Sequence, residues 1–208
     1  NPFCMTYNNC LFCCHKGCPK NNHTEKEVED FYFKYMPKLF KQYDSILSKQ
    51  DIKLVSFGGG TPNYLPDDKF EEYLKSIPDY ILKARKLIEL HPALITEDFI
   101  RVLAKYNFST AIFCFQTFDE NILKANGRLV PDYANAFKCM RLAKTLGINV
   151  AVDLITYWTT KDGWENVLKK DFEILGEIPD EITISVLYQN KYNREDFFYC
   201  FCPHSFDV

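Results

Sequence analysis

The sequence predicts an α/β fold in which parallel strands form a partial (β/α)6 barrel. Short segments that are apolar at nearly every position alternate with amphipathic helical segments along most of the chain. Strands of that composition are covered on both faces, as the strands of parallel sheets are. Polar side chains also follow several of these strands, and barrel enzymes carry their active sites at the carboxyl ends of strands. The 208 residues are enough for one domain with a substantial core.

The chain begins with a loop rich in cysteine. Five of its nine cysteines lie within the first 18 residues, interrupted by Pro, Asn and Gly: Cys4, Cys10, Cys13, Cys14 and Cys18. Such a run cannot form a packed helix or strand and is typical of a loop that binds a metal through thiolates. The strand that should precede this loop is missing from the numbering, so we expect a barrel whose first strand is missing or truncated.

The spacing of the cysteines narrows the choice of metal. Structural zinc usually takes two closely spaced cysteine pairs, and here only Cys10 and Cys13 form such a pair. Three cysteines around an iron–sulfur cluster leave one iron open to a small molecule, and Cys4, Cys10 and Cys13 suit that arrangement. Zinc and a disulfide cluster are the alternatives.

A long polar helical segment follows the loop, at 21–49. Thr24 and Glu27 have the spacing of a capping box, and an apolar stripe at helical spacing comes after them. Pro37 falls inside this stripe, so we expect the helix to be kinked or divided there.

The first predicted strand, 51–57, leads directly into Gly58-Gly-Gly-Thr-Pro62. Glycines after a strand let backbone amides approach a ligand, because no Cβ stands in the way. Helices are then expected at 66–77, 96–106, 119–124, 132–146 and 163–175, and strands at 86–90, 110–115, 148–155 and 181–187.

We therefore expect a core domain at 1–187, with its cluster loop at 1–20. A tail of unclear role follows at 188–208. There Cys200, Cys202 and His204 are close enough in sequence to bind a metal, although short Cys/His spacings also arise by chance.

Three polar residues mark the ends of predicted strands. Glu89 lies in Glu-Leu-His-Pro92, Gln116 follows an apolar strand, and Asp153 interrupts another. A carboxylate within an apolar run is unfavourable unless it is paired or functional. We predict a functional role for Asp153, with a satisfied buried carboxylate as the alternative.

Together these motifs resemble the radical S-adenosylmethionine (SAM) superfamily. The stretch from Phe3 to Cys13 is similar to its cluster loop, Cys-x3-Cys-x-aromatic-Cys, with Phe12 as the aromatic residue. The later motifs resemble successive signatures of the branch that holds oxygen-independent coproporphyrinogen III oxidase and haem chaperones. They are Gly-Gly-Gly-Thr-Pro62, Glu-x-x-Pro92, the segment 115–128 and Val-Asp-Leu-Ile155. The resemblance covers about residues 1–187.

The resemblance implies two cofactors, a 4Fe-4S cluster and SAM. Its cluster ligands would be Cys4, Cys10 and Cys13. The SAM-binding residues would be Phe12 near the adenine, Gly58, Gly59, Gly60 and Thr61 at the amino group, Glu89 and Arg128 at the amino-acid end, and Gln116 and Asp153 at the ribose. The chemistry agrees, because arginine suits a carboxylate, and a carboxylate or amide suits paired hydroxyls.

The chain also departs from the pattern of that branch. Five residues rather than three separate Cys4 from Cys10, and Cys14 directly follows Cys13 where the oxidase has Cys-x-Cys. Tyr157-Trp-Thr-Thr160 replaces an expected Gly-Leu-Pro turn. The branch has a larger C-terminal domain that closes over substrate, and we expect this chain to lack it, so we do not carry porphyrinogen decarboxylation over.

The predicted function is reductive cleavage of SAM to a 5′-deoxyadenosyl radical that abstracts hydrogen from an unknown substrate, a small molecule or a tetrapyrrole-like compound. A flavodoxin or ferredoxin would supply the electron. A haem-binding chaperone and a metal-binding module without catalysis are the alternatives. The four histidines form no triad or zinc-hydrolase pattern, and His91 is expected to be structural.

Composition excludes other classes. A net charge of −3 gives no basic footprint for nucleic acid, and no apolar run is long enough for a membrane span. We expect a cytoplasmic protein whose cysteines are thiols or ligands.

Overall fold

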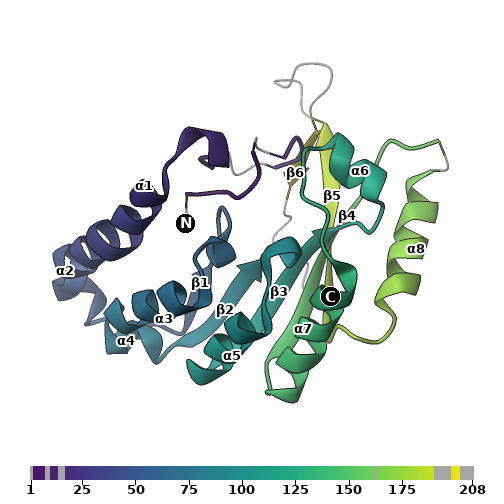
Figure 1. The fold of residues 1–208 in the computed structure, drawn as a ribbon. Helices are drawn as coiled ribbons and strands as arrows, with labels where there is room; N and C mark the ends of the chain where they lie inside the picture. The colour runs from purple at the N-terminus through teal and green to yellow at the C-terminus, as the bar shows by residue number, and fades with distance from the viewer. Residues whose placement is uncertain (1, 8–9, 14–16, 162, 190–197, 202–208) are drawn as a thin grey trace.

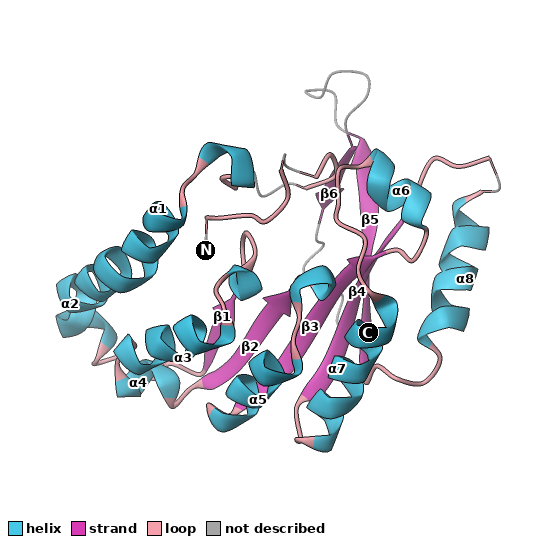
Figure 2. Ribbon diagram, viewed as in Figure 1, coloured by secondary structure: helices cyan, strands magenta, loops and turns pink. Residues whose placement is uncertain are grey.

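The computed structural model of the chain describes residues 2–7, 10–13, 17–161, 163–189 and 198–201. Its central element is one sheet with the strand order β1-β2-β3-β4-β5-β6 (Figure 1). The five parallel strands are β1 (Leu54–Phe57), β2 (Arg85–Leu90), β3 (Phe108–Gln116), β4 (Asn149–Thr156) and β5 (Glu181–Gln189). They form a curled half-barrel, which confirms the predicted fold class (Figure 2).

The sixth strand of the sheet was not predicted. The sequence predicts a barrel whose first strand is missing or truncated, and no strand precedes β1 among the residues that the structure describes. Instead β6 (Phe198–Phe201) pairs antiparallel with β5 at the opposite edge of the sheet. Near the amino terminus, Phe3 forms only an isolated parallel bridge with Cys18.

Helices connect consecutive parallel strands, as the predicted alternation requires. They are α3 (Asp67–Ser76) with α4 (Asp79–Leu82), α5 (Glu97–Lys105), α6 (Glu120–Ala125) with α7 (Tyr133–Thr145), and α8 (Trp164–Leu175). Short 3-10 turns at Pro62–Tyr64 and Pro92–Leu94 follow β1 and β2. The short helix α4 was not predicted, because its four residues carry no periodic pattern.

The helical segment after the cysteine loop is divided, as Pro37 predicted. Helices α1 (Glu25–Asp30) and α2 (Met36–Leu47) are joined by a π-helical turn, Phe31–Tyr35. The amide of Met36 bonds to the carbonyl of Phe31, five residues back. The π-turn therefore lies just before Pro37, the residue that has no amide hydrogen to donate to the helix.

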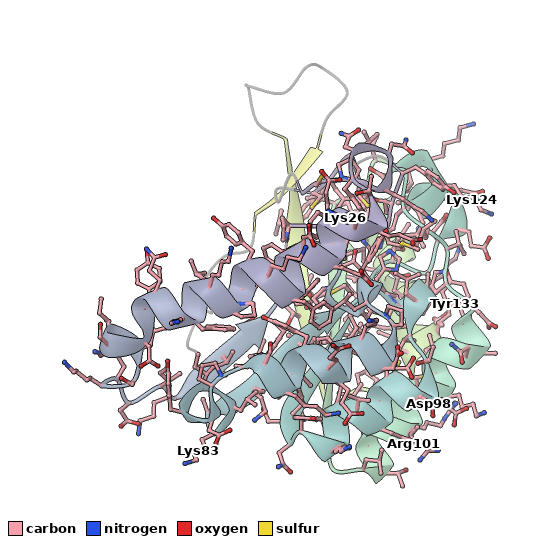
Figure 3. The ribbon with its side chains drawn as sticks, turned by 60° about the vertical axis from the view of Figure 1, so that its left-hand side comes forward. Lys26, Lys83, Asp98, Arg101, Lys124 and Tyr133 are labelled. Atoms are coloured by element: carbon pink, nitrogen blue, oxygen red, sulfur yellow. The ribbon has the colours of Figure 1, made fainter. Side chains whose placement is uncertain are left out.

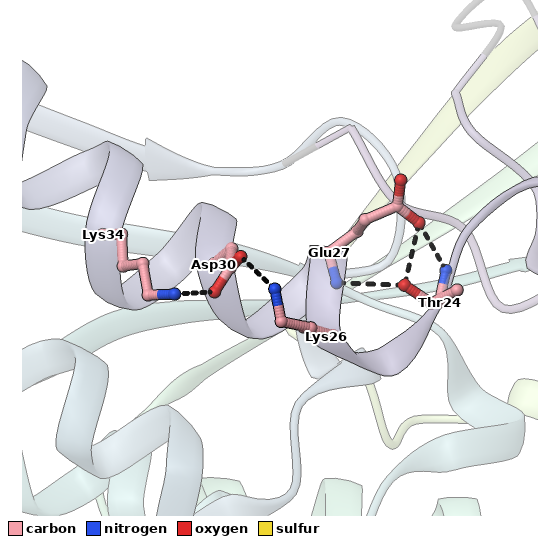
Figure 4. Close-up of polar contacts among 5 residues, drawn as sticks. All are labelled: Thr24, Lys26, Glu27, Asp30 and Lys34. Carbon is pink, nitrogen blue, oxygen red and sulfur yellow. Dashed lines mark hydrogen bonds and ion pairs between the residues drawn. The ribbon is translucent and has the colours of Figure 1, made fainter.

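The predicted capping box of α1 is confirmed (Figure 4). The Thr24 hydroxyl accepts the amide of Glu27 at 3.2 Å, and the Glu27 carboxylate accepts the amide of Thr24 at 2.7 Å. The amides of Thr24 and Glu27 have no carbonyl partner within the helix, so the side chains of the capping box supply their acceptors and fix where α1 begins.

Charged side chains cover the outer surface of the helices. Lys26, Lys83, Asp98 and Arg101 point away from the protein interior (Figure 3). Where such residues pair, as Arg101 does with Asp98 at 3.8 Å, both partners are exposed. Exposed pairs contribute little stability, so this surface is a solvated face.

Two apolar clusters make the core. The larger lies between the sheet and its helices and includes the stacked rings of Phe70 and Phe99. The smaller lies where the cysteine loop meets the end of β4, and consists of Cys10, Phe12, Ile155, Trp158, Val167 and Leu187. This smaller cluster anchors the cysteine loop against the barrel. None of the helices in the described part of the chain is both long and apolar enough to cross a membrane.

Candidate functional site at the carboxyl ends of the strands

The cysteine loop is bonded to the carboxyl-terminal rim of the sheet at two points. At the first, the amide of Thr61 donates to the carbonyl of Phe3 at 2.7 Å, and the amide of Met5 donates to the Thr61 hydroxyl at 3.3 Å. At the second, the amide of Leu11 donates to the carbonyl of Asn126 at 3.1 Å. The loop therefore lies on the rim that carries the glycine segment, as predicted.

The glycines after β1 are required by close contacts. A Cβ on Gly58 would lie 2.9 Å from the carboxyl group of Glu89, and a Cβ on Gly60 would overlap the carbonyl of Phe3. Gly59 between them has a φ of +98°, a conformation that residues with a Cβ rarely adopt. The segment can therefore pass between Glu89 and the cysteine loop only as glycine.

Two of the predicted cysteine ligands, Cys4 and Cys10, lie where the cysteine loop meets the rim of the sheet. The Cys4 sulfur is 3.2 Å from the Thr6 hydroxyl and 3.6 Å from the Thr61 hydroxyl. Cys10 is buried, and Nη1 of Arg128 lies 3.9 Å from its sulfur. Burial raises the pKa of the Cys10 thiol, while the neighbouring guanidinium acts in the opposite direction.

The third predicted ligand, Cys13, closes a tight turn. Its amide donates to the carbonyl of Cys10 at 3.0 Å, and its side chain packs beside the smaller apolar cluster. The backbone of Cys18 lies beside Cys4, since its carbonyl accepts the Cys4 amide at 2.9 Å, but its thiol donates to the carbonyl of Asn22 at 3.3 Å. Cys14 lies outside the described residues, as do Cys202, His204 and the side chain of Cys200.

Within the described ranges, no three His, Cys, Asp or Glu side chains are grouped closely enough to hold a single metal ion. A four-iron cluster is far larger than one ion and separates its cysteine ligands accordingly. The donor set at this rim, thiols from a loop and no second cysteine pair, suits a thiolate-bound cluster better than a tetrahedral zinc site.

Arg128 lies at the centre of the site's electrostatics. Its guanidinium donates to the carbonyl of Cys114 and lies over the ring of Phe12, 5.8 Å from the ring centre. It follows α6, where its amide donates to the carbonyl of Leu123 at 2.9 Å. Without the family resemblance, nothing in the sequence distinguishes Arg128 from an ordinary surface arginine.

Asp153 is half-buried on β4 and faces β3. The Cys114 thiol donates to its Oδ2 at 3.5 Å, and Thr183 on β5 also bonds to it. Burial raises the pKa of the Asp153 carboxyl. Burial also raises the pKa of the Cys114 thiol, and the negative charge of Asp153 raises it further. Cys114 was missed from sequence, because a cysteine in an apolar strand looks like any other core residue.

Gln116 ends β3 in an unusual conformation. Its φ is +71°, in the left-handed region that residues other than glycine seldom occupy. The pairing of β3 with β4 also shifts between Phe113 and Gln116. The register of β3 on β4 thus changes just before the residue predicted to bind ribose, which still pairs with Leu154.

Phe12 is buried and packs edge-to-face on Trp158, with 5.6 Å between ring centres. Thr156 Oγ1, Trp158 Nε1 and Thr160 Oγ1 are buried without a hydrogen-bond partner in the described part of the chain. Unpaired buried polar groups are rare and point to a missing ligand or water. Trp158 and Thr160 belong to the segment 157–160 that departs from the family pattern, and Thr156 directly precedes it at the end of β4.

His91 is buried, and its Nε2 has no hydrogen-bond partner in the part of the chain that the structure describes. Its Nδ1 accepts the amide of Ala93 at 3.2 Å, and the Asn63 side chain bonds both its amide and its carbonyl, at 2.9 and 3.0 Å. Burial, with the nearby Arg128, holds the pKa of His91 well below its usual value. Asn63, which sequence reasoning missed, thus ties the glycine segment to the end of β2.

Comparison with known proteins identifies the family. The family model described as the radical SAM superfamily matches residues 2–170. The chain is 30% identical over 159 residues to an oxygen-independent coproporphyrinogen III oxidase from Synechocystis sp., over 74% of this chain and 33% of that protein. It is 26% identical over 124 residues to the haem chaperone HemW from Lactococcus lactis, over 58% of this chain and 32% of that protein.

A solved structure has the same fold. Coproporphyrinogen III oxidase (HemN) from Escherichia coli aligns with a TM-score of 0.73 at 21% identity, over 88% of this chain and 42% of that chain. The chain therefore spans well under half the length of each of these three proteins. Since the family model matches most of the chain, this protein belongs to the radical SAM superfamily.

Proposed function

We propose that this domain binds a 4Fe-4S cluster through Cys4, Cys10 and Cys13 and binds SAM beside it. When bound, the reduced cluster supplies one electron that cleaves SAM to methionine and a 5′-deoxyadenosyl radical, which takes hydrogen from a substrate. The observation that carries the proposal is the bonding of Thr61 to Phe3, because it joins the cysteine loop directly to the glycine segment.

Glu89 and Arg128 would bind the two ends of an amino acid. The Glu89 carboxyl lies against Gly58, since a Cβ there would be 2.9 Å from it, and so Glu89 borders the glycine segment. Arg128 would pair with the carboxylate, since its planar guanidinium suits that group. Its present bond to the Cys114 carbonyl leaves other guanidinium hydrogens for a ligand.

Gln116 and Asp153 would bind the ribose hydroxyls, and Phe12 would border the adenine. Asp153 is suited to this role because it lies on β4 with Cys114 and Thr183 fixing its orientation. The unpartnered polar atoms of Thr156, Trp158 and Thr160 support a polar ligand in the same region. The apolar cluster around Phe12 would exclude water from it.

Single cysteine substitutions test the ligand assignment. Cys10→Ala and Cys13→Ala should each lose nearly all iron after anaerobic reconstitution with iron and sulfide, while Cys14→Ala and Cys18→Ala should retain it. Cys18 is the sharpest control, because its thiol bonds to the Asn22 carbonyl instead. Equal iron loss in all four variants would show that the assignment is wrong.

The likeness to HemW supports a second candidate, a haem-binding chaperone. A haem titration of the reconstituted domain distinguishes the two. Tight haem binding without formation of 5′-deoxyadenosine favours the chaperone. For the catalytic candidate, we propose a small-molecule or tetrapyrrole-like substrate and a flavodoxin or ferredoxin as the electron donor.

A further inference from the structure

We propose that Asp171, on α8, is a positioning residue for the cofactor site. It lies outside the site itself. Its carboxylate fixes the turn after β3, and through α6 it sets the positions of Arg128 and of the Cys10–Cys13 turn. The inference rests on the proposed function for its cofactor readout, while its structural readout is independent of any cofactor.

The first step is the turn that follows Gln116. Oδ1 of Asp171 accepts the amide of Phe118 at 2.7 Å and the hydroxyl of Thr117 at 3.1 Å. Asp171 is only 1% exposed, so these bonds are shielded from water. They hold the two residues directly after Gln116, whose left-handed backbone is unfavourable unless its surroundings fix it.

The second step carries this restraint into α6. The Thr117 hydroxyl also accepts the amide of Asp119 at 3.1 Å. Asp119 in turn caps α6, because its Oδ1 accepts the amides of Asn121 and Ile122 at 2.9 and 3.1 Å. The start of α6 is therefore set by a hydrogen-bond network that begins with buried bonds on α8 and ends at the partly exposed cap of α6.

The third step leads from α6 to the predicted ligands. At the end of α6, Asn126 accepts the amide of Leu11, and the amide of Arg128 donates to Leu123. The Arg128 guanidinium lies 3.9 Å from the Cys10 sulfur. One short helix, α6, thus connects the Asp171 network to both the cysteine loop and the cationic group of the site.

The carboxylate is also costly to bury, which argues for a specific role. Oδ2 of Asp171 has no hydrogen-bond partner in the described part of the chain. It lines a cavity between α6 and α8 with Phe118, Asp119, Glu120, Val167 and Lys170. Asp119 lies close enough to raise its pKa further, and Tyr133 of α7 also lies within electrostatic reach. The bonds to Oδ1 offset part of this cost, because an apolar side chain here would leave the Phe118 amide and the Thr117 hydroxyl without their acceptor.

Asp180 offers a matched control. Its carboxylate also accepts a backbone amide from the sheet, that of Val150 at 2.9 Å, and it pairs with Lys144 at 2.7 Å. Val150 lies near the amino end of β4, at the rim of the sheet that faces away from the cysteine loop. Loss of this carboxylate removes comparable bonds without touching the site.

The test compares the unsubstituted chain with Asp171→Ala, Asp171→Asn and Asp180→Ala. In the apo protein, amide hydrogen exchange should rise at least about tenfold at Leu11 and across 117–128 in Asp171→Ala. It should stay within about threefold in Asp171→Asn, whose Oδ1 still accepts both bonds. Asp180→Ala should leave these amides unchanged.

In protein reconstituted with iron and sulfide, Asp171→Ala should weaken SAM binding about tenfold, with rescue by Asp171→Asn and no effect in Asp180→Ala. If Asp171→Ala does not fold, Thr117→Val removes the hydroxyl that links Asp171 to Asp119 and should show the same direction of change. Unchanged exchange at Leu11 in a folded Asp171 or Thr117 variant overturns the inference, as does an equal effect of Asp180→Ala. If the unsubstituted chain binds no SAM, the proposed function fails, and the exchange result still decides the inference.

Discussion

At the scale of single residues, Gly60 is where the glycine segment and the cysteine loop are in closest contact. A Cβ at this position would overlap the backbone of Phe3, and backbone cannot move aside as a flexible side chain can. Any larger residue must therefore push the cysteine loop away from Thr61.

Gly60→Ala should accordingly lose most of its capacity for iron after reconstitution, because Cys4 directly follows Phe3 in the displaced loop. Gly147→Ala is the control. Gly147 has a φ of +79° but open space around its Cα, so alanine there adds backbone strain of roughly 1–2 kcal/mol without a clash. Iron loss in both variants to the same extent would mean that general destabilisation, rather than the contact with Phe3, explains the result.

Asp171 makes a prediction about pH. Burial raises the pKa of its carboxyl to about 6 from an ordinary 3.8, so the folded protein binds a proton there that the unfolded chain releases. The free energy of unfolding should therefore fall as pH rises from about 4 to about 6, by an amount on the order of 3 kcal/mol.

Urea unfolding of the unsubstituted chain and of Asp171→Asn across this pH range measures that contribution. The neutral amide does not titrate, so the difference in unfolding free energy between the two proteins should change with pH in that window and level off above it. A difference that is constant from pH 4 to pH 7 would contradict the raised pKa.

The sequence predicted those residues whose chemistry stands out from their neighbours. Glu89 and Asp153 are carboxylates in apolar strands, and the thiols crowd together in one loop. Asp171 and Cys114 were missed because their partners are distant in sequence. Asp171 bonds to Phe118 across 53 residues, and Cys114 bonds to Asp153 across 39. Only the fold brings such pairs together.

At the scale of elements, the ends of β1 and β2 are joined by Asn63. Its side chain satisfies both the amide and the carbonyl of His91, and all of these groups are buried. This bond pair holds the segment after Gly58-Gly-Gly-Thr-Pro62 against the strand that carries Glu89.

Asn63→Ala should lower the free energy of unfolding by roughly 2–4 kcal/mol, because two buried backbone groups lose their partner. Asn149→Ala is the control, since Asn149 bonds to Glu181 at 2.8 Å on the exposed surface. Its loss should change the free energy of unfolding by less than about 0.5 kcal/mol. Urea unfolding of both variants gives the comparison, and equal losses would show that the bonds to His91 are not important to stability.

Local sequence patterns predicted which segments are helices and which are strands, but they did not predict the strand at the edge of the sheet. The capping box of Thr24 and the position of Pro37 predicted the start and the division of the first helical segment, and both are confirmed. The strand β6 was not predicted, since an edge strand that pairs on one side leaves no clear apolar alternation in the sequence.

In the molecule as a whole, the residues that stabilise the half-barrel and the residues of the candidate site lie in different places. The larger apolar cluster lies between sheet and helices, whereas the polar residues of the site meet at one rim, where the cysteine loop lies across the strand ends. Loops at that rim can vary without altering the core. Departures of this chain from the family pattern, such as 157–160, lie there.

The central claim is that this rim cleaves SAM at a thiolate-bound cluster. The most direct test reconstitutes the chain anaerobically with iron and sulfide, adds dithionite and SAM, and measures 5′-deoxyadenosine and methionine. We expect both products in equal amounts from the unsubstituted chain and neither from Cys10→Ala. A chain that retains its iron and sulfide but forms no 5′-deoxyadenosine would contradict it.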